Sequence, residues 1–450
     1  MTGAFFILIA LIYVRSVRNL FHLIKNTSWI TKMTSRFALK SSPKTSFIVC
    51  IPAYKEQATI IETMEYFLAL DYPPEKLRFI IATTQKEADS KTSTRQIVEK
   101  YINSQKISSQ KRLRIIHYPK TNGLMAHQIN FAAKSIKKEL TSAYFVVYNA
   151  DSRPDKKTFR YVDAAIENYK KQYTVYPTIL QQSALFNSTR SQHQSTASYL
   201  LGMGTALHQS LWTLTQEITR FKNQSIHTPK LRKKNNIFNT LLHARYAHSV
   251  GHGLFIKGSH YLSNMLPENV LNEDMPYGLL QSSLRNAIYP IPLLEVASSP
   301  SRITNVYKQK SVWFNPFFEY HIALSTIIKN NQYESLIEVY FLTLQAYISL
   351  LIWLFHSSIW IVSLILSIAL GAPYFALWVI GLVLYWFIPS FIAKSFIERN
   401  TIPINVKVSS IFIGTIYVLT HSLGPLIATA KWTIAISRKS KPTKPKTENA

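Results

Sequence analysis

The 450-residue sequence contains a single cysteine, Cys50. One cysteine cannot form an intrachain disulfide, and it cannot build a cysteine-rich metal site. Cys50 lies in the apolar run 46–51, which predicts a buried and unreactive thiol. The sequence therefore excludes both kinds of cysteine site, and it fits a reducing compartment.

Acidic residues are also scarce, because 23 Asp and Glu stand against 51 Lys and Arg and give a formal net charge of +28. So basic a chain is typical of proteins that bind nucleic acid, anionic lipid headgroups or phosphorylated substrates. The apolar segments described next favour the last two and argue against nucleic acid. For any single basic residue, a solvated surface or a role in membrane topology is an equally good interpretation.

Charges are sparse over residues 336–431, where long apolar runs take their place. A transmembrane helix needs about 20 predominantly apolar residues. Any one run could be a buried helix of a soluble domain, but four in succession favour a membrane region over 336–431. The predicted spans are 336–355, 357–371, 373–393 and 408–431, of which the second is short.

The apolar stretch 5–14 lacks two marks of a cleaved signal peptide, because no basic residue precedes it and no Ala-x-Ala site follows it. It is also short for a full span. We interpret residues 1–30 as an N-terminal membrane segment, either an uncleaved signal anchor or a first transmembrane helix. A cleaved signal peptide is the alternative.

The positive-inside rule orients the chain. The tail 437–450 carries five Lys and Arg residues, and the central domain is strongly basic, so both are expected on the inner side. Four spans between them return the chain to the side it left. The sequence thus predicts a multi-pass integral membrane protein of the plasma membrane, in contact with membrane lipids, with its catalytic domain and C-terminus in the cytoplasm.

Between residues 46 and 292, apolar strand patterns alternate with helical patterns. This alternation predicts an α/β fold with a mostly parallel, Rossmann-like sheet. Ligands bind such sheets beyond the carboxyl ends of the strands, so the residues after each strand are the first candidates for a site. The strands are expected at 46–51, 77–82, 113–117 and 143–148, and the helices at 59–70, 94–102 and 124–136.

Acidic residues form candidate sites at two places. Asp151 comes directly after the fourth strand, where a carboxylate is well placed to hold Mg²⁺ or Mn²⁺ together with phosphate oxygens. Glu273 and Asp274 precede a helical stretch, where a carboxylate could act as a general base. Helix capping is the alternative interpretation of all three residues.

Two further groups carry less information. Trp313 lies between the soluble domain and the first C-terminal span, and it could stack on a sugar or anchor the chain at the membrane interface. The stretch 315–332 has the pattern of an interfacial helix. The crowded histidines match no zinc signature, so they are not assigned to a metal; they are His243, His248, His252 and His260.

Six motifs in a fixed order resemble those of the membrane-bound family 2 glycosyltransferases, the group of the cellulose and hyaluronan synthases. The resemblance covers 46–314. Each motif alone is weak, but six in the correct order are specific. They are Pro-Ala-Tyr-Lys-Glu at 52–56, Gly-Leu-Met-Ala-His-Gln-Ile-Asn at 123–130, Asn-Ala-Asp at 149–151, Gly-His-Gly-Leu-Phe at 251–255, Asn-Glu-Asp at 272–274 and Gln-Lys-Ser-Val-Trp at 309–313.

The resemblance implies a GT-A glycosyltransferase domain over 46–314 and an inverting, metal-dependent hexosyl transfer from a nucleotide-diphosphate sugar, with UDP preferred, to a polysaccharide or glycolipid acceptor. Asp151 would bind the Mg²⁺ or Mn²⁺ on the donor diphosphate, and Asp274 would be the general base with Glu273 beside it. Trp313 and His252 would bind the acceptor. The donor-binding residues would be Tyr54, Glu56, Glu87, Asp89, Asn149 and Gln309.

Three departures from the family's pattern motivate an alternative, a catalytically impaired relative that scaffolds glycan assembly. Asn149 stands where the family's Asp-x-Asp motif has its first Asp, and Val312 stands where the Gln-x-x-Arg-Trp motif has Arg. The acidic pair expected near Thr84 is missing, and Glu87 or Asp89 could take its place as the contact to the nucleotide. A membrane transporter is a further alternative, but the predicted spans contain few charged residues.

Overall fold

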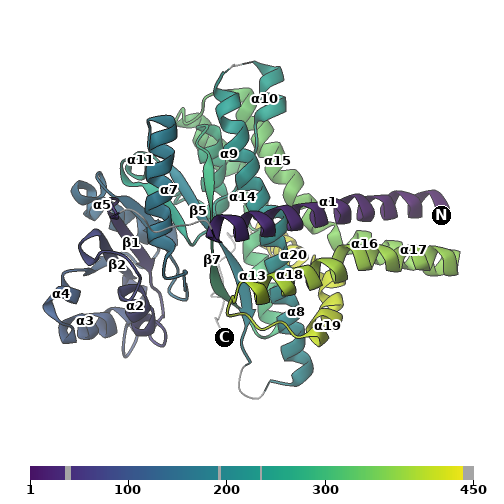
Figure 1. Cartoon of the computed structure of the whole chain (residues 1–450), viewed down its shortest axis with the longest axis horizontal. Helices are drawn as coiled ribbons and strands as arrows, with labels where there is room; N and C mark the ends of the chain where they lie inside the picture. Colours follow the sequence, from purple (N-terminus) through teal and green to yellow (C-terminus); the bar gives the residue numbers. More distant parts are fainter. Residues whose placement is uncertain (36–41, 191–193, 234–235, 439–450) are drawn as a thin grey trace.

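The computed structural model describes residues 1–35, 42–190, 194–233 and 236–438. Most of the basic tail predicted at 437–450 lies outside the described residues. Seven strands form one sheet at one end of the molecule, and a group of apolar helices extends from it (Figure 1).

The sheet has the strand order β3-β2-β1-β4-β6-β5-β7. The first four strands are parallel, as predicted, and lie within two residues of the expected ranges. β6 is antiparallel to both of its neighbours, and β5 and β7 pair in parallel. The strands are β1 (Phe47–Pro52), β2 (Leu77–Thr84), β3 (Leu113–Tyr118), β4 (Tyr144–Val147), β5 (Ile179–Ser188), β6 (Leu254–Lys257) and β7 (Ile288–Ser299).

Side chains of β1 alternate between the two faces of the sheet because successive residues of a strand point to opposite sides. Phe47 and Val49 face a core built with α2 (Ile60–Leu68), α3 (Thr94–Ser104) and α7 (Thr158–Tyr173). Ile48 and Cys50 face the other core, which includes α5 (Met125–Ser135). Cys50 is fully buried, and burial raises the pKa of its thiol, so the predicted inert cysteine is confirmed.

Helices account for most of the remaining chain. In the sequence between β5 and β6, α8 (Thr196–Trp212) continues through the π-helical turn η3 (Thr213–Glu217) into α9 (Ile218–Lys233). The three segments form one long helical rod. The remaining helices before the apolar group are α4 (Ile107–Gln110), α6 (Lys137–Leu140), α10 (Ile237–His243), α11 (Gly258–Ser263), α12 (Asp274–Ser283), α13 (Ile303–Phe314) and α14 (Pro316–Lys329), with 3-10 turns η1 (Pro74–Lys76) and η2 (Gln85–Glu87).

Among the described residues, four helical segments are long and apolar enough to cross a membrane. They are α1 (Thr2–Ser35), α15 (Leu336–Leu354), the continuous α17–η4–α18 segment (Ala372–Arg399) and the α19–α20 segment (Val408–Ser437). The predicted span 357–371 is α16 (His356–Leu370), whose 15 residues are fewer than the roughly 20 that a span needs. α1 extends well beyond the predicted apolar stretch 5–14, and it packs along α16, α17 and α18 (Figure 1).

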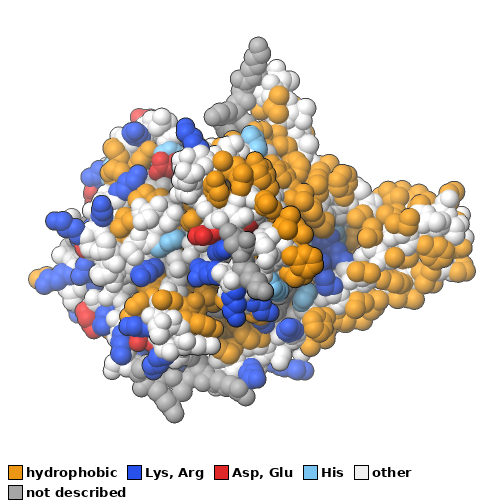
Figure 2. All heavy atoms as spheres, turned by 90° about the horizontal axis from the view of Figure 1, so that it is seen from above, with side chains coloured by type: hydrophobic (Ala, Val, Ile, Leu, Met, Phe, Trp, Pro, Cys, Tyr) orange, Lys and Arg blue, Asp and Glu red, His pale blue; other side chains and the backbone are white. Residues whose placement is uncertain are grey.

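The C-terminal segments are divided at identifiable residues. α17 (Ala372–Leu382) joins α18 (Ile388–Arg399) through a π-helical turn, η4 (Val383–Phe387). α19 (Val408–Thr420) joins α20 (Leu423–Ser437) at His421 and Ser422. Apolar side chains gather on the outside of these helices and set them apart from the charged surface of the sheet domain (Figure 2).

Gly258 should tolerate no side chain, because a Cβ there would lie 1.9 Å from the carbonyl oxygen of Leu140 and 2.7 Å from that of Ala143. Backbone atoms cannot move away cheaply, so we expect Gly258→Ala to lower the free energy of unfolding by about 2 kcal/mol or more. Thermal unfolding in detergent measures the change. Gly3→Ala is the control, since that Cβ would have no neighbour within 4 Å; equal melting temperatures for the two variants would contradict the prediction.

Candidate active site

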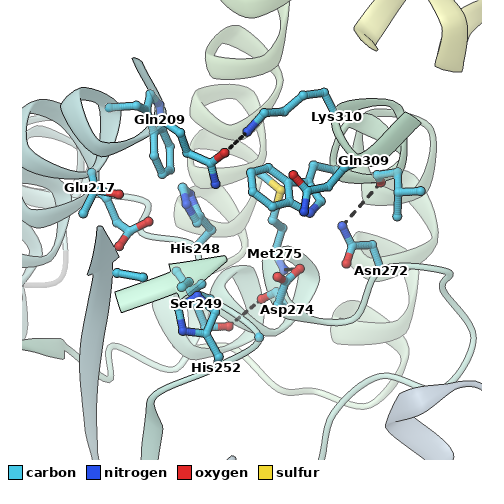
Figure 3. Close-up of a pocket in the computed structure, with 18 of the residues that line it drawn as sticks. Gln209, Glu217, His248, Ser249, His252, Asn272, Asp274, Met275, Gln309 and Lys310 are labelled. Atoms are coloured by element: carbon cyan, nitrogen blue, oxygen red, sulfur yellow. Dashed lines mark hydrogen bonds between the residues drawn. The ribbon is translucent and has the colours of Figure 1, made fainter. Parts of the chain in front are cut away.

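A cavity of about 820 Å³ lies between the carboxyl ends of β1 and β4 and the apolar helices. The loops after both strands form one wall, and α12 and α13 form another. The π-turn η3 and residues of α1 and α15 complete it. Figure 3 shows side chains from these separate elements converging on the cavity.

The loops after β1 and β4 bring three of the predicted donor-binding residues together with the predicted metal ligand. Tyr54, Glu56, Asn149 and Asp151 all line the cavity. Burial, and then the nearby carboxylate of Glu295, raise the pKa of Asp151. A divalent cation would relieve this repulsion, so the position suits a metal.

The described residues contain no group of three or more His, Cys, Asp and Glu side chains that could hold a metal ion. Asp151 would therefore need oxygen ligands from elsewhere. Mg²⁺ is commonly bound through one or two carboxylates together with substrate phosphates, and the position of Asp151 fits that pattern.

Glu87 and Asp89 do not line the cavity. Glu87 is buried and accepts hydrogen bonds from the backbone nitrogens of Lys55 (2.6 Å) and Thr94 (2.7 Å), so it ties the β1 loop to the start of α3. Asp89 is exposed. The same segment instead sends Lys86 into the cavity wall, 5.8 Å from the ring centroid of Tyr54.

Glu273 and Asp274 lie at the N-terminus of α12, where the helix dipole favours negative charge. Asp274 lines the cavity, and its Oδ1 accepts a hydrogen bond from the backbone nitrogen of Met275 at 2.7 Å. The hydroxyl of Ser249 donates to the Asp274 carbonyl oxygen at 2.5 Å. These contacts fix the start of the helix, and the carboxylate borders the cavity from there (Figure 3).

The helix α13 contributes Gln309, Lys310 and Trp313 to the cavity wall. Gln309 Oε1 is buried and has no hydrogen-bond partner among the described residues. Lys310 lies 3.8 Å from the ring centroid of Trp313 and donates to Gln209 Oε1 at 2.6 Å. Burial keeps the pKa of Lys310 well below its ordinary value. Its amine therefore holds a positive charge less readily than the Arg that the resembled motif has at the position of Val312.

His252 is held by Glu295, a residue that no motif indicated. The His252 Nδ1 lies 2.9 Å from Glu295 Oε2, and both side chains are largely buried. Burial alone would lower the pKa of His252, but Glu295, followed by Glu217 and Asp151, raises it to about 9. The cavity thus holds an imidazolium among carboxylates.

Glu217 is a second residue that sequence reasoning missed. It ends the π-turn η3, lines the cavity, and has one carboxylate oxygen buried with no hydrogen-bond partner among the described residues. Burial raises its pKa to about 7. π-turns inside α-helices are frequent at functional sites, but neither the turn nor the helix around it has a motif that would single out Glu217.

Residues 48–232 match the family model of Glycosyl transferase family 2. Curated proteins gave no match. Solved structures with a similar fold include the mannosyltransferase PcManGT from Pyrobaculum calidifontis in complex with GDP-Man and Mn²⁺, at 14% identity and a TM-score of 0.46 over 92% of this chain and 99% of that one. Another is S. aureus TarS 1-349 in complex with UDP-GlcNAc, at 12% identity and a TM-score of 0.37 over 89% and 93%.

Replacing Glu295 with Gln should lower the pKa of His252 toward 6.5. A histidine whose pKa is raised on folding stabilises the protein fully below pH 6.5, and this stabilisation is lost as the pH rises through 9. The melting temperature of the wild type should therefore exceed that of Glu295→Gln below pH 6.5, by the equivalent of roughly 2–3 kcal/mol, and the gap should close by pH 9.

The matched control is Glu268→Gln, since Glu268 lies 3.9 Å from His127 in a more exposed pair. Its melting temperature should follow that of the wild type across the same pH range. A constant gap between the wild type and Glu295→Gln would show that His252 does not titrate as stated.

Proposed function

We propose that the chain is a family 2 glycosyltransferase with a GT-A fold followed by apolar helices, on the match of residues 48–232 to that family model and on the mostly parallel first half of the sheet. From this premise we propose that the chain is a membrane-bound, inverting hexosyltransferase. It transfers a sugar from a nucleotide-diphosphate sugar to a hydroxyl of a growing polysaccharide or glycolipid. The observation that carries the proposal is that Asp151 and Asp274, from separate elements, border one cavity that reaches the apolar helices.

The donor binds at the carboxyl ends of β1 and β4, where ligands of such sheets bind. Tyr54 and Lys86 contact the nucleotide portion, and Asn149 and Asp151 lie at its diphosphate. Asp151 is the residue that would hold Mg²⁺ or Mn²⁺, and the ion, when bound, would offset the charge that builds on the leaving group. Asn149 can hydrogen-bond there but adds no charge, so Asp151 is the essential carboxylate. A UDP-sugar is the proposed donor.

Asp274 accepts the proton of the acceptor hydroxyl as its oxygen attacks the anomeric carbon. The new carbon–oxygen bond forms on the face opposite the departing nucleotide diphosphate, which leaves with the electrons of the broken bond, so the configuration inverts. Glu273 is buried beside the base at the N-terminus of α12. Trp313 and Gln309 border the acceptor sugar, and the protonated His252 supplies a hydrogen-bond donor to its hydroxyls.

The proposed topology places the sheet domain and the C-terminus in the cytoplasm, at the inner face of the plasma membrane. The strong excess of Lys and Arg supports this orientation, because cytoplasmic segments of membrane proteins carry such an excess. Residues 1–30 and 336–431 would then lie in the bilayer, and α14 would lie along its surface within 315–332. The cytoplasm is also where nucleotide sugars would have to reach the cavity.

Asp151→Ala should abolish metal-dependent donor binding, since the loss of this carboxylate removes the ion that links protein and diphosphate. The measurement is calorimetric titration of UDP-, GDP- and dTDP-sugars into the purified protein with and without Mn²⁺. Asp89→Ala is the control, because Asp89 is exposed and outside the cavity. Binding of no nucleotide sugar by a well-folded wild type would favour the scaffold alternative.

Asp274→Asn should keep donor binding and lose transfer by roughly 10²- to 10⁴-fold, the usual contribution of a general base. Product formation at saturating donor measures the rate, and titration of the donor confirms that its site is intact. Glu99→Gln, the same chemical change at an exposed carboxylate, should leave the rate unchanged. Wild-type turnover by Asp274→Asn would remove the base assignment while leaving the donor site in place.

A further inference from the structure

Four arginines line the cavity. Arg245 donates to the backbone carbonyl oxygens of Leu242 and Ala244, and the other three come from helices. Arg15 and Arg18 come from α1, and Arg220 comes from α9. Within the described residues, no carboxylate lies within salt-bridge distance of any of them. Glu217 attracts the Arg220 guanidinium from beyond ion-pair distance. Within the described residues, the three guanidinium groups therefore carry positive charge that no ion pair neutralises.

Arg15 and Arg18 are unusual because α1 is one of the four segments apolar enough to cross a membrane. Charged side chains in such helices are costly, and they generally face a cavity or a partner. Residues three apart lie on one side of a helix, and both arginines line the cavity. The Nε of Arg15 is buried without a hydrogen-bond partner among the described residues, so it has a donor to offer.

Arg220 is fixed in position by neutral groups. One of its terminal nitrogens lies 3.0 Å from His248 Nδ1, and the other donates to Ser349 Oγ on α15 at 2.9 Å. Burial, followed by the charge of Arg220 itself, keeps the pKa of His248 well below its ordinary value, so the imidazole is neutral and adds no counter-charge. A guanidinium has five N–H donors, and these contacts leave others for a ligand.

The cavity reaches the apolar surface beside these arginines. Arg18 of α1 is exposed, and Ile348 and Ile352 of α15 are 45% and 44% exposed, yet all three line the cavity. α1 packs on α16–α18, whereas α15 packs on α12 and α14. Figure 2 shows basic side chains set back between the apolar projecting helices and the body of the molecule.

We propose that Arg15, Arg18 and Arg220 bind the phosphate of an anionic lipid acceptor, whose hydrocarbon chain enters between α1 and α15. This inference rests on the proposed function and names the acceptor class: a phosphate-linked lipid carrying the sugar whose hydroxyl Asp274 deprotonates. Guanidinium groups suit the site because they bind phosphate through two parallel hydrogen bonds.

Two other sources of phosphate have the same chemistry, free phosphate and the donor's own diphosphate. The position of the arginines favours the lipid. The donor residues follow strands of the sheet, where a soluble nucleotide has access, whereas Arg15 and Arg18 belong to an apolar helix and are bordered by exposed Ile348 and Ile352. A ligand that satisfies both the charges and this apolar border has an anionic head and an aliphatic tail.

The test compares hexadecyl phosphate, hexadecanol and inorganic phosphate as ligands of the full chain in detergent, with binding read by native mass spectrometry. The wild type should bind hexadecyl phosphate more tightly than hexadecanol. The variant Arg15→Gln/Arg18→Gln should lose about tenfold or more of the affinity for hexadecyl phosphate, since charge-assisted hydrogen bonds are lost, and none for hexadecanol. Lys25→Gln/Lys32→Gln is the control, with the same charge change at exposed positions of α1 outside the cavity.

Equal affinity of the arginine variant and the control for hexadecyl phosphate would overturn the proposal. So would competition by inorganic phosphate at the same concentration, or an equal loss of nucleotide-sugar binding in the arginine variant, which would assign the arginines to free phosphate or to the donor. Arg18→Gln alone, at an exposed position, gives a second variant should the double variant fail to fold, and it should show part of the same loss.

The proposed function is tested separately by the dependence of nucleotide-sugar binding on Asp151. If that dependence is missing while lipid binding still requires the arginines, the transferase proposal fails and the lipid-phosphate site stands. If donor binding requires Asp151 but the arginines have no effect on lipid binding, only the acceptor class is wrong.

Discussion

The parallel pairing of β1 with β4 is the constraint on which the site depends. The two strands run side by side in register, with Phe47 opposite Tyr144 and Cys50 opposite Val147, so their carboxyl ends open at one edge of the sheet. Tyr54 and Asp151, almost 100 residues apart in sequence, border one cavity for this reason. Their positions follow from the burial of two charge-free strands, which cannot shift register without exposing the apolar core on both faces.

A second constraint joins the sheet domain to the apolar helices. The rod α8–η3–α9 packs on β5 at one side and on α19 at the other, and the π-turn in its middle packs on α1. Asn26 of α1 donates to the carbonyl oxygen of Leu214 in that turn at 2.7 Å, and Gln216 donates to Asn19 at 2.5 Å. The turn that presents Glu217 to the cavity is therefore held by the helix that presents the arginines, so the two sides of the cavity cannot be positioned independently.

The sequence predicted the half of the fold whose strands are continuous apolar runs. β1 to β4 are such runs, and the loops after them carry the motifs that located Tyr54 and Asp151. The sequence did not predict the other half, because its strands mix polar with apolar residues or are very short. β5 contains the buried pair Gln181 and Gln182, whose side chains bond to His252 and to Leu293, and β6 has only four residues.

Sequence patterns failed to indicate several residues of the cavity for a related reason. Glu217 and Glu295 belong to the site only because the fold brings a helix and a strand that are distant in sequence close to His252. No local spacing of residues in the sequence indicates this arrangement. Arg15 and Arg18 follow the apolar stretch 5–14 in the sequence, but in the structure they lie inside a 34-residue helix. A basic residue after an apolar run is ordinary at a membrane boundary, and only the cavity beside α1 distinguishes a boundary from a binding site.

Most charges in the cavity are grouped by sign, although Glu217 and Arg220 attract each other from one helical rod. This grouping has consequences for the empty protein. Carboxylates gather around His252 near the donor loops, while Arg15, Arg18 and Arg220 lie where the cavity meets the apolar helices. Like charges that repel in the absence of ligand destabilise the fold, and a ligand that neutralises them binds the folded state alone and stabilises it. Under the two proposals above, a metal-bound donor would offset the first group and an anionic lipid the second, so each ligand would supply a counter-charge that the empty cavity lacks.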